Sequence, residues 1–438
     1  MDRLTPSAVE SEARSRVALV GPDGVVRSFG DLADEVSATS PPSCVAFVAT
    51  PTLEAVVRVY AHLEHRVPFV PLHPKWLPSD AEEIRARAGV AWSEKVLHDH
   101  TAVLLATSGS SGPAKLARIT RANLLASAHA HELNLPFVPE DRWLLALPFA
   151  HAGGLSILTR CLAARSTVVL APSFDVEDVL ERIARSGVTL LSVVPTALTK
   201  LLDADRHRAL SRLRAVLVGG APFPAALRAR AQAAGVRALA TYGLTETISQ
   251  IATASLDDAW NPERRDSGRP LAGVNLHIST ANGPTTQSGI EGEILVRGEV
   301  VFDGYVGAPP RALGDALRTG DRGKFDSEGR LVVLGRLDDL IITGGENVHP
   351  TEVEAEVMKV AGVREVVVFG MPDSVWGEVV SAALVLTEGI QAEEVVATAN
   401  GALPTFRRIR KWLVLPSLPT NAMGKLSRRE VKDRCAKS

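Results

Sequence analysis

The sequence has few cysteines, no long apolar run and no apolar leader, and each absence excludes a class of protein. The three cysteines, Cys44, Cys161 and Cys435, lie far apart without the spacing of metal ligands, which fits a reducing compartment. No apolar stretch approaches the roughly 20 residues that span a bilayer. The charged N-terminal stretch lacks the apolar core of a signal peptide. We therefore expect a cytoplasmic protein without a membrane partner.

The chain also lacks an excess of charge of either sign. Its 48 basic and 50 acidic residues leave a formal net charge of −2, which gives no sign of a nucleic-acid partner. Hydrophobic residues make up 46% of the sequence and charged residues 22%, which is ordinary for a globular protein. A length of 438 residues exceeds what one hydrophobic core usually supports, so two or more domains are expected.

Short β-branched runs alternate with longer runs rich in Ala, Arg, Leu and Glu over the first 245 residues. The pattern predicts strands at 44–50, 67–72, 166–171, 188–194, 213–220 and 236–243. It predicts helices at 53–66, 176–187, 195–204 and 224–235. Apolar strands separated by helices indicate a parallel sheet that is covered on both faces.

The pattern changes from about Val274, where the strands become shorter and Gly, Asp and Asn separate them. Strands are expected at 274–280, 292–298, 300–307 and 329–336, in a small and mostly antiparallel region. Beyond the charged turn Gly335–Asp339, a helix at 351–362 and strands at 363–370 and 379–386 indicate a compact α+β domain. We therefore predict an α/β fold with an N-terminal domain over 1–335, including the β-rich subdomain, and a C-terminal domain over 336–438.

An apolar strand runs into a small, hydroxyl-rich glycine loop at 102–115. Gly109 and Gly112 allow tight turns that point backbone amides outward, and the loop ends in Lys115. The hydroxyl groups that add donors belong to Thr107, Ser108, Ser110 and Ser111. The Walker pattern cannot be placed on this loop. It is suited to holding phosphate oxygens, and the alternative is a surface turn after a strand.

A second segment, 240–250, ends a strand at Tyr242 and Gly243 and continues into Thr245 and Glu246. Open α/β sheets place ligand contacts at the carboxyl ends of their strands. A carboxylate there can hold Mg²⁺ against a phosphate, and a tyrosine can stack on a base. Simple packing of an aromatic-glycine turn is the alternative.

Two further segments carry candidate residues near and beyond the predicted domain boundary. Asp321 follows a glycine and is placed to accept both hydroxyls of a ribose, with Arg336 assisting and Asp338 at the interdomain joint. Solvated turns are the alternative for this stretch. Lys425 ends the loop 419–425 within a basic tail, which by itself indicates a solvated face or a surface for an anionic partner.

In this order and spacing, the four segments resemble the adenylate-forming superfamily of acyl-CoA synthetases, peptide-synthetase adenylation domains and luciferases, over about 28–425. The resemblance implies ATP, Mg²⁺ and coenzyme A, and a mobile C-terminal domain that rotates about Asp338. It implies ATP-phosphate contacts from Thr107, Ser108, Gly109, Ser110, Ser111, Gly112 and Lys115. It also implies adenine and ribose contacts from Gly219, Gly220, Ala221, Pro222, Tyr242, Gly243, Asp321 and Arg336. Catalytic groups would be Thr245, Lys425 and Glu246, with Glu246 as the metal ligand, and Gly344 and Gly345 would line the thiol tunnel.

The phosphate loop departs from the superfamily pattern, because Ser111, Ala114 and Leu116 replace Thr, Pro and Gly. The serine keeps the hydroxyl, so phosphate binding should survive. The loss of the proline removes a preset φ, which is expected to weaken the site without abolishing it.

Three stretches, at 147–157, 192–202 and 241–250, are similar to the o-succinylbenzoate–CoA ligase family of menaquinone biosynthesis. The likeness implies that an aromatic acid is activated as acyl-AMP, with release of pyrophosphate, and passed to coenzyme A. His151 would gate the acid and thiol, unless it only caps a glycine turn. Thr247, Ser249 and Gln250 are candidates for contacts at the acyl end.

Two other functions remain open from the sequence. An enzyme that adenylates a benzoate- or anthranilate-like acid could load a carrier protein's phosphopantetheine, and the basic tail favours that docking. A non-catalytic nucleotide-binding relative is disfavoured because Lys425 and Glu246 are both present. The sequence does not distinguish a monomer from a homodimer.

Overall fold

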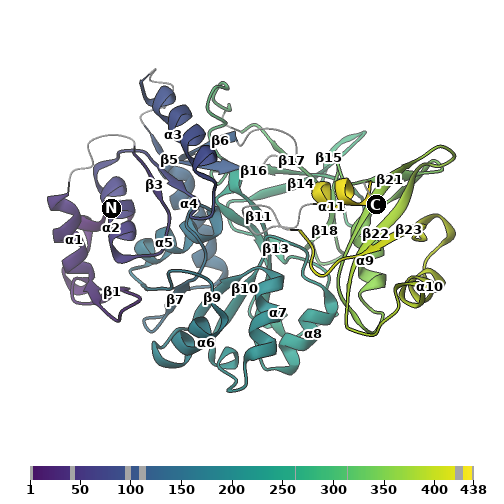
Figure 1. The fold of residues 1–438 in the computed structure, drawn as a ribbon. Coiled ribbons are helices and arrows are strands. Elements are labelled where there is room, and N and C mark those ends of the chain that lie inside the picture. The colour runs from purple at the N-terminus through teal and green to yellow at the C-terminus, as the bar shows by residue number, and fades with distance from the viewer. Residues whose placement is uncertain are drawn as a thin grey trace. The chain divides into compact units, whose positions relative to one another are not determined.

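The computed structural model describes residues 3–39, 45–93, 100–107, 115–261, 263–312, 314–419 and 428–436 (Figure 1). The chain divides into two compact units, which are described separately. The first comprises Met1–Leu276 and Val296–Leu317, and the second comprises His277–Leu295 and Arg318–Ser438. Among the described residues, no helix has the length and apolar character needed to cross a bilayer.

The first unit contains a nine-stranded sheet with the order β13-β12-β11-β10-β9-β7-β8-β1-β2. From β1 to β11 neighbouring strands run parallel, whereas β2, β12 and β13 pair antiparallel with their neighbours. The strands are β1 (Val17–Val20), β2 (Val26–Ser28), β7 (Arg142–Leu145), β8 (Thr167–Leu170), β9 (Leu190–Val193), β10 (Ala215–Val218), β11 (Ala238–Leu244), β12 (Ser249–Thr253) and β13 (Arg269–Pro270).

The sheet is parallel because its buried apolar strands are joined by amphipathic crossover helices. These are α6 (Val176–Arg185), α7 (Pro195–Ala204) and α8 (Ala225–Ala233), which Figure 1 shows beside β9 and β10. Asp175 caps α6 by accepting a hydrogen bond from the amide of Asp178, and Pro195 starts α7 with its φ already suited to a helix. Their apolar faces share one core with β8, β9 and β10.

A second sheet of the first unit has the order β3-β4-β5-β6. Its strands are β3 (Val45–Val48), β4 (Phe69–Leu72), β5 (Thr101–Thr107) and β6 (Lys115–Thr120), of which only β6 is antiparallel to its neighbour. The other α-helices of this unit are α1 (Phe29–Ala38), α2 (Leu53–His65), α3 (Pro78–Ser93), α4 (Arg121–Asn134) and α5 (Ala152–Ala164). Short 3₁₀ helices are η1 (Pro6–Ala8), η2 (Ser11–Ala13), η3 (Leu210–Arg212), η4 (Thr245–Thr247) and η5 (Asp257–Trp260).

Two small sheets supply most of the second unit. The first has the order β15-β14-β16-β17-β18, with β14 (Asn275–Thr280), β15 (Gly283–Thr285), β16 (Gly292–Arg297), β17 (Leu317–Phe325) and β18 (Leu331–Arg336). The second has the order β20-β19-β22-β21, and β23 pairs with β22. Its strands are β19 (Ile341–Thr343), β20 (Glu346–Val348), β21 (Val363–Asp373), β22 (Gly377–Leu386) and β23 (Lys411–Val414).

Helices cover the second of these sheets. They are α9 (Pro350–Val357), α10 (Ala392–Ala402), η6 (Thr405–Arg407) and α11 (Arg428–Cys435). Apolar side chains of α9 and α10 pack with β21 and β22 in one core, and Val431 of α11 joins a separate cluster with β21. This is the α+β arrangement that the C-terminal sequence predicts.

The predicted α/β class is confirmed, and most predicted elements end within two or three residues of the observed ones. The strand predicted at 300–307 is wrong: that segment is irregular, with one isolated bridge between Tyr305 and Ala117. The cause is backbone geometry, since Gly304 and Gly307 have φ values of +115° and +84°. The domain boundary at 335/336 stays a prediction, because the packing units group residues by contact and not by motion.

Candidate active site

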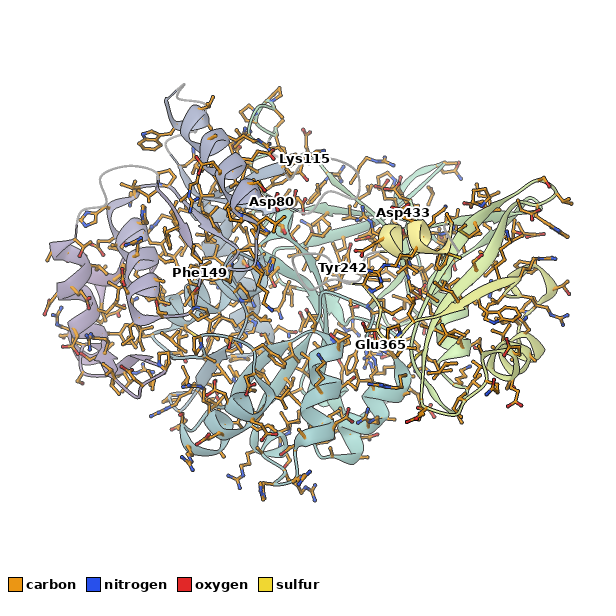
Figure 2. All side chains as sticks on the ribbon, in the orientation of Figure 1. Asp80, Lys115, Phe149, Tyr242, Glu365 and Asp433 are labelled. Carbon is orange, nitrogen blue, oxygen red and sulfur yellow. The ribbon has the colours of Figure 1, made fainter. Side chains whose placement is uncertain are left out.

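The ends of the predicted phosphate loop are held together by an antiparallel strand pair. Thr107 ends β5 opposite Lys115, which begins β6, and the Thr107 hydroxyl donates to the Lys115 carbonyl at 3.4 Å. Thr107 is buried, whereas Lys115 is exposed and labelled in Figure 2. Five other predicted phosphate contacts lie outside the described residues and stay predictions: Ser108, Gly109, Ser110, Ser111 and Gly112.

The second predicted segment forms a tight reversal between β11 and β12. Ile248 and Ser249 have φ values of +51° and +83°, a left-handed pair that is costly for residues with side chains. The strands approach so closely that a Cβ on Gly243 would lie 1.4 Å from the Ser249 carbonyl oxygen. Only glycine fits at position 243, so the reversal is encoded in the sequence.

Side chains hold this reversal in its strained form. The Thr247 hydroxyl accepts the Leu244 amide at 3.1 Å and lies 3.2 Å from the Ser249 carbonyl. The Ser127 hydroxyl of α4 donates to the Ile248 carbonyl at 3.0 Å. Thr247 is fully buried, so its hydroxyl supports the turn in this structure, and its predicted contact with the acid stays a prediction.

Glu246 lies on η4, immediately after the reversal's first strand. Its Oε1 accepts a hydrogen bond from the Tyr305 hydroxyl at 2.6 Å, and its carbonyl accepts the Phe302 amide at 2.8 Å. The Lys115 ammonium lies 5.2 Å from the centre of the Tyr305 ring. The structure therefore brings together two of the predicted residues, Lys115 and Glu246, on either side of a tyrosine.

The oxygen groups of this segment fit Mg²⁺. Mg²⁺ prefers hard oxygen ligands and is usually held by one or two carboxylates together with substrate phosphates. Glu246 and the Thr245 hydroxyl are such groups, and the described part of the chain contains no group of three or more Asp, Glu, His or Cys side chains that could hold a metal ion. The donor set suits a cation that a nucleotide brings with it.

The predicted adenine wall lies at the carboxyl ends of two neighbouring parallel strands. β10 leads into Gly219, and Tyr242 lies near the end of β11, two residues beyond the part of β11 that pairs with β10. A Cβ on Gly219 would lie 2.7 Å from the Thr241 hydroxyl, so the two segments are in close contact. Gly220, Ala221 and Pro222 follow as an exposed turn, and Tyr242, labelled in Figure 2, is half-buried. This is where open α/β sheets bind ligands.

His151 is the N-cap residue of α5 and is half-buried. Its carbonyl accepts the Leu155 amide at 3.0 Å, and its ring lies 4.9 Å from the ring of His73, which follows β4. Burial lowers the pKa of His73, so this neighbour is held in its neutral form near pH 7. The sequence did not predict His73, since a single histidine after a strand carries no signal of its own.

Gln250 points into the core and away from any open surface. Its Oε1 accepts a hydrogen bond from Nδ1 of His131 at 3.0 Å, and both residues are at most 3% exposed. Burial holds the pKa of His131 well below its usual range, so this imidazole is neutral with its proton on Nδ1. The acid contacts predicted for Ser249 and Gln250 stay predictions.

The predicted ribose pair is formed within the second unit. Asp321 and Arg336 face each other across β17 and β18, with Oδ1 and Nη1 3.1 Å apart. Arg336 also donates to the Thr319 carbonyl at 3.1 Å, and the Thr319 hydroxyl accepts the Asp321 amide at 3.0 Å. Gly320 has a φ of +71°, which this bend requires. The carboxylate is therefore held in a fixed position by the arginine.

The remaining predicted residues lie in turns of the second unit. Asp338 is exposed in the turn between β18 and β19. Gly344 and Gly345 form the β19–β20 turn with φ values of +59° and +85°, and the Gly344 amide donates to the Trp376 carbonyl at 2.9 Å. Lys425 lies outside the described residues, so its role stays a prediction.

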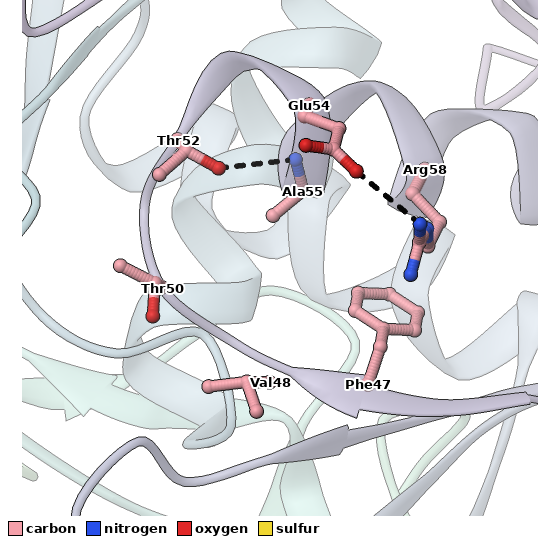
Figure 3. A pocket seen from close by; sticks show the side chains of 7 residues that line it. All are labelled: Phe47, Val48, Thr50, Thr52, Glu54, Ala55 and Arg58. Carbon is pink, nitrogen blue, oxygen red and sulfur yellow. Dashed lines mark hydrogen bonds and ion pairs between the residues drawn. The ribbon is translucent and has the colours of Figure 1, made fainter.

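A surface cavity of about 230 Å³ lies elsewhere, between β3 and the start of α2 (Figure 3). Phe47, Val48 and Thr50 line one side of it, and Glu54 pairs with Arg58 on the other at 3.4 Å. Ligand pockets usually enclose about 300–1,000 Å³. None of the predicted site residues lines this cavity, and its charged side chains, Glu54 and Arg58, pair with each other.

Comparisons with known proteins agree with the geometry. The family profile described as AMP-binding enzyme matches residues 89–306, and the profile of the AMP-binding enzyme C-terminal domain matches 352–425. The 2-succinylbenzoate–CoA ligase of Bacillus subtilis is 39% identical over 342 residues, which are 76% of this chain and 69% of that protein. The corresponding ligase of Bacillus licheniformis is 37% identical over 83% of this chain and 77% of its own length.

Solved structures give the same result over nearly the whole chain. The o-succinylbenzoate–CoA synthetase of Bacillus subtilis in complex with its acyl-adenylate matches with a TM-score of 0.86 and 31% identity, over 99% of this chain and 98% of that one. The same enzyme in complex with ATP and a magnesium ion matches with a TM-score of 0.86 and 30% identity, over 99% of both chains. The chain therefore belongs to the family of AMP-binding enzymes, alongside the 2-succinylbenzoate–CoA ligases, and is an AMP-forming acid–thiol ligase.

Proposed function

We propose that the chain is an o-succinylbenzoate–CoA ligase that uses ATP and Mg²⁺ and serves menaquinone biosynthesis. The observation that carries this proposal is the joining of Lys115, Tyr305 and Glu246 beside the end of the phosphate loop. A cation and a carboxylate beside this loop support the proposal, because a triphosphate and its metal ion need groups of these two kinds. The choice of o-succinylbenzoate as the substrate rests on the relatives at 37–39% identity, which are named as ligases of this acid.

The reaction proceeds in two displacements. A carboxylate oxygen of the acid attacks the α-phosphorus of ATP, and the bond to pyrophosphate breaks to leave acyl-AMP. The thiolate of coenzyme A then attacks the acyl carbon, and AMP leaves with the electron pair of the former mixed anhydride. Both attacking groups are anions, so the enzyme's task is to position them and to offset charge repulsion.

The described residues suit the first displacement. Lys115 provides a positive charge beside the phosphates, and Tyr242 and the turn after Gly219 flank the adenine. Glu246 and Thr245 would hold Mg²⁺, which neutralises phosphate charge when bound. In the second unit, Asp321 is oriented by Arg336 and would accept the ribose hydroxyls.

The experiment that tests the substrate is pyrophosphate release with ATP, Mg²⁺, coenzyme A and a panel of acids. The panel contains o-succinylbenzoate, benzoate, anthranilate, salicylate and a medium-chain fatty acid. Release with o-succinylbenzoate alone, with its CoA thioester detected by mass, supports the proposal. Faster release with another aryl acid assigns the same chemistry to a different pathway.

Two variants test the assignment of residues in the C-terminal region. Lys425→Ala should nearly abolish acyl-AMP formation but leave thioester formation from supplied acyl-AMP largely intact. Asp338→Pro should do the reverse, because it fixes φ at the predicted hinge. Equal loss of both half-reactions in Lys425→Ala would contradict the two-conformation assignment.

The acceptor is the second point to test. A carrier protein's phosphopantetheine presents the same thiol as coenzyme A, and the basic tail favours an acidic partner. Adenylate that accumulates with coenzyme A but is discharged by a holo-carrier protein would assign the carrier as the acceptor. We propose that the reaction takes place in the cytoplasm. Sedimentation analysis would distinguish a monomer from a homodimer.

A further inference from the structure

The segment between β16 and β17 is bound tightly to β6, the strand that follows the phosphate loop. Arg118 of β6 is completely buried and donates to the carbonyls of Asp303, Tyr305 and Ala308 at 3.1, 2.5 and 3.0 Å. Its Nε also lies 3.3 Å from the Asp303 carboxylate. The backbone carrying Tyr305 therefore cannot move independently of the strand that begins with Lys115.

The same segment is also bound to η4, the short helix that carries Glu246. The Phe302 amide donates to the Glu246 carbonyl at 2.8 Å, and the Tyr305 hydroxyl donates to Glu246 Oε1 at 2.6 Å. The Phe302 ring packs edge-on against the Tyr305 ring with centres 4.8 Å apart, which fixes the ring's orientation. Tyr305 thus reaches Glu246 through a hydroxyl whose position is set from two sides.

The ring of Tyr305 has a second contact. The Lys115 ammonium lies 5.2 Å from the ring centre, within the range in which a cation is attracted to an aromatic ring. One side chain therefore contacts a lysine from the end of the phosphate loop through its ring and the carboxylate of η4 through its hydroxyl. These are the two charges that the proposed function places on the triphosphate and on its metal.

We infer that Tyr305 is a positioning residue that sets Lys115 and Glu246 for the nucleotide, the first through its ring and the second through its hydroxyl. The inference rests on the proposed function, because it takes Glu246 as the metal-binding carboxylate. The hydroxyl occupies one carboxylate oxygen and leaves the other for the cation, as partners of metal ligands commonly do. The ring restricts the long Lys115 side chain before the nucleotide binds. Less conformational entropy is then lost when the ammonium binds phosphate.

Two substitutions separate the two contacts. Tyr305→Phe keeps the ring and deletes the hydroxyl, whereas Tyr305→Leu deletes both. Tyr60→Phe is the matched control, because Tyr60 is buried in α2 and its hydroxyl donates to the carbonyl of Leu158, which is not a predicted site residue, at 3.0 Å. It removes one hydroxyl hydrogen bond from the fold and none from the site.

ATP binding to the full-length protein is measured by calorimetry, first in EDTA and then with Mn²⁺. The fraction of Mn²⁺ that is bound is measured by electron paramagnetic resonance. In EDTA, Tyr305→Phe should bind ATP like wild type, and Tyr305→Leu about two- to five-fold more weakly. With Mn²⁺, Tyr305→Phe should bind the metal–nucleotide about 10- to 100-fold more weakly. Tyr60→Phe should match wild type in both conditions.

Three results would overturn the inference. If Tyr305→Phe keeps wild-type Mn²⁺ binding, the hydroxyl does not position Glu246. If it loses ATP affinity equally with and without metal, the residue acts only on the fold, and thermal unfolding of the same sample will show that loss. If wild type itself binds ATP without any gain from Mn²⁺, the proposed role of Glu246 fails and the inference fails with it.

Discussion

Replacing Arg118 by methionine tests whether its buried guanidinium holds the Tyr305 segment in place. The side chain is completely buried and makes four hydrogen bonds, one of them to the Asp303 carboxylate, which is 13% exposed. Methionine fills most of the volume but removes the guanidinium donor from that carboxylate and from three carbonyls, of which those of Asp303 and Tyr305 keep the backbone amides of Arg311 and Ala308 as donors. Removal of one partner from a buried ion pair costs about 3–5 kcal/mol, so we expect a loss of that size.

The assay is urea-induced unfolding of the full chain, followed by circular dichroism and tryptophan fluorescence. Because the chain forms two compact units, more than one transition is expected, and the loss should fall in the transition of the first unit. Arg58→Met is the matched control: Arg58 is 46% exposed and pairs with Glu54 on the same helix, so its loss should stay within about 0.5 kcal/mol.

A double substitution adds a further check. In Arg118→Met/Asp303→Asn the carboxylate that pairs with Arg118 is removed together with the guanidinium, so the combined loss should be smaller than the sum of the two single losses. A loss below about 1 kcal/mol in Arg118→Met, or a value equal to that of Arg58→Met, would refute the reasoning.

Three further predictions concern a turn, a buried histidine and the ribose contact. Gly243→Ala places a Cβ 1.4 Å from a backbone carbonyl oxygen and should prevent soluble expression, whereas Gly89→Ala meets nothing within 4 Å in α3 and should stabilise by about 0.5–1 kcal/mol in thermal unfolding. Burial lowers the pKa of His131, and the positive charges of Arg160 and Arg214 lower it further. When the pH falls, His131 is therefore protonated in the unfolded chain before it is protonated in the folded one. The free energy of unfolding should therefore be highest above about pH 6.5 and decrease below that pH. In urea titrations, His131→Gln should make this decrease smaller, whereas His129→Gln, at an exposed position, should leave it unchanged. Asp321→Asn should raise the KM for ATP about ten-fold or more with a smaller change in kcat, measured by pyrophosphate release, and an unchanged KM would contradict the ribose assignment.

The strands and crossover helices of the parallel sheet could be predicted because the residues within each of them determine its structure. The four residues of β10 are all buried and apolar, and the helix that follows, α8, has its own apolar face. Such a strand can only be buried in a sheet covered on both sides, which is why the sequence predicts the parallel core. Strand pairing within the sheet follows from these crossovers.

The irregular segment before β17 was not predictable in the same way. Its β-branched and aromatic residues have the composition of a strand, yet two glycines with positive φ bend it, and Tyr305 meets partners far away in the sequence. Glu246 is 59 residues away and Arg118 is 187 residues away. A pattern of neighbouring residues contains no information about such contacts.

For the candidate site residues, too, the sequence predicts what is specified locally and misses what depends on distant contacts. The types and spacing of Lys115, Glu246 and Asp321 indicate their chemistry, because phosphate, metal and ribose each need a particular group. The direction of a side chain is decided by packing, so the sequence could not show that Gln250 turns toward His131. It also could not show that Arg336 holds Asp321 through a cross-strand pair.

The measurement that tests the central claim most directly is mass analysis of single-turnover reactions with o-succinylbenzoate, ATP and Mg²⁺, quenched before and after coenzyme A is added. The account predicts o-succinylbenzoyl-AMP and pyrophosphate before the addition, and o-succinylbenzoyl-CoA and AMP after it. Formation of ADP and phosphate, or a CoA thioester that never passes through the adenylate, would contradict it.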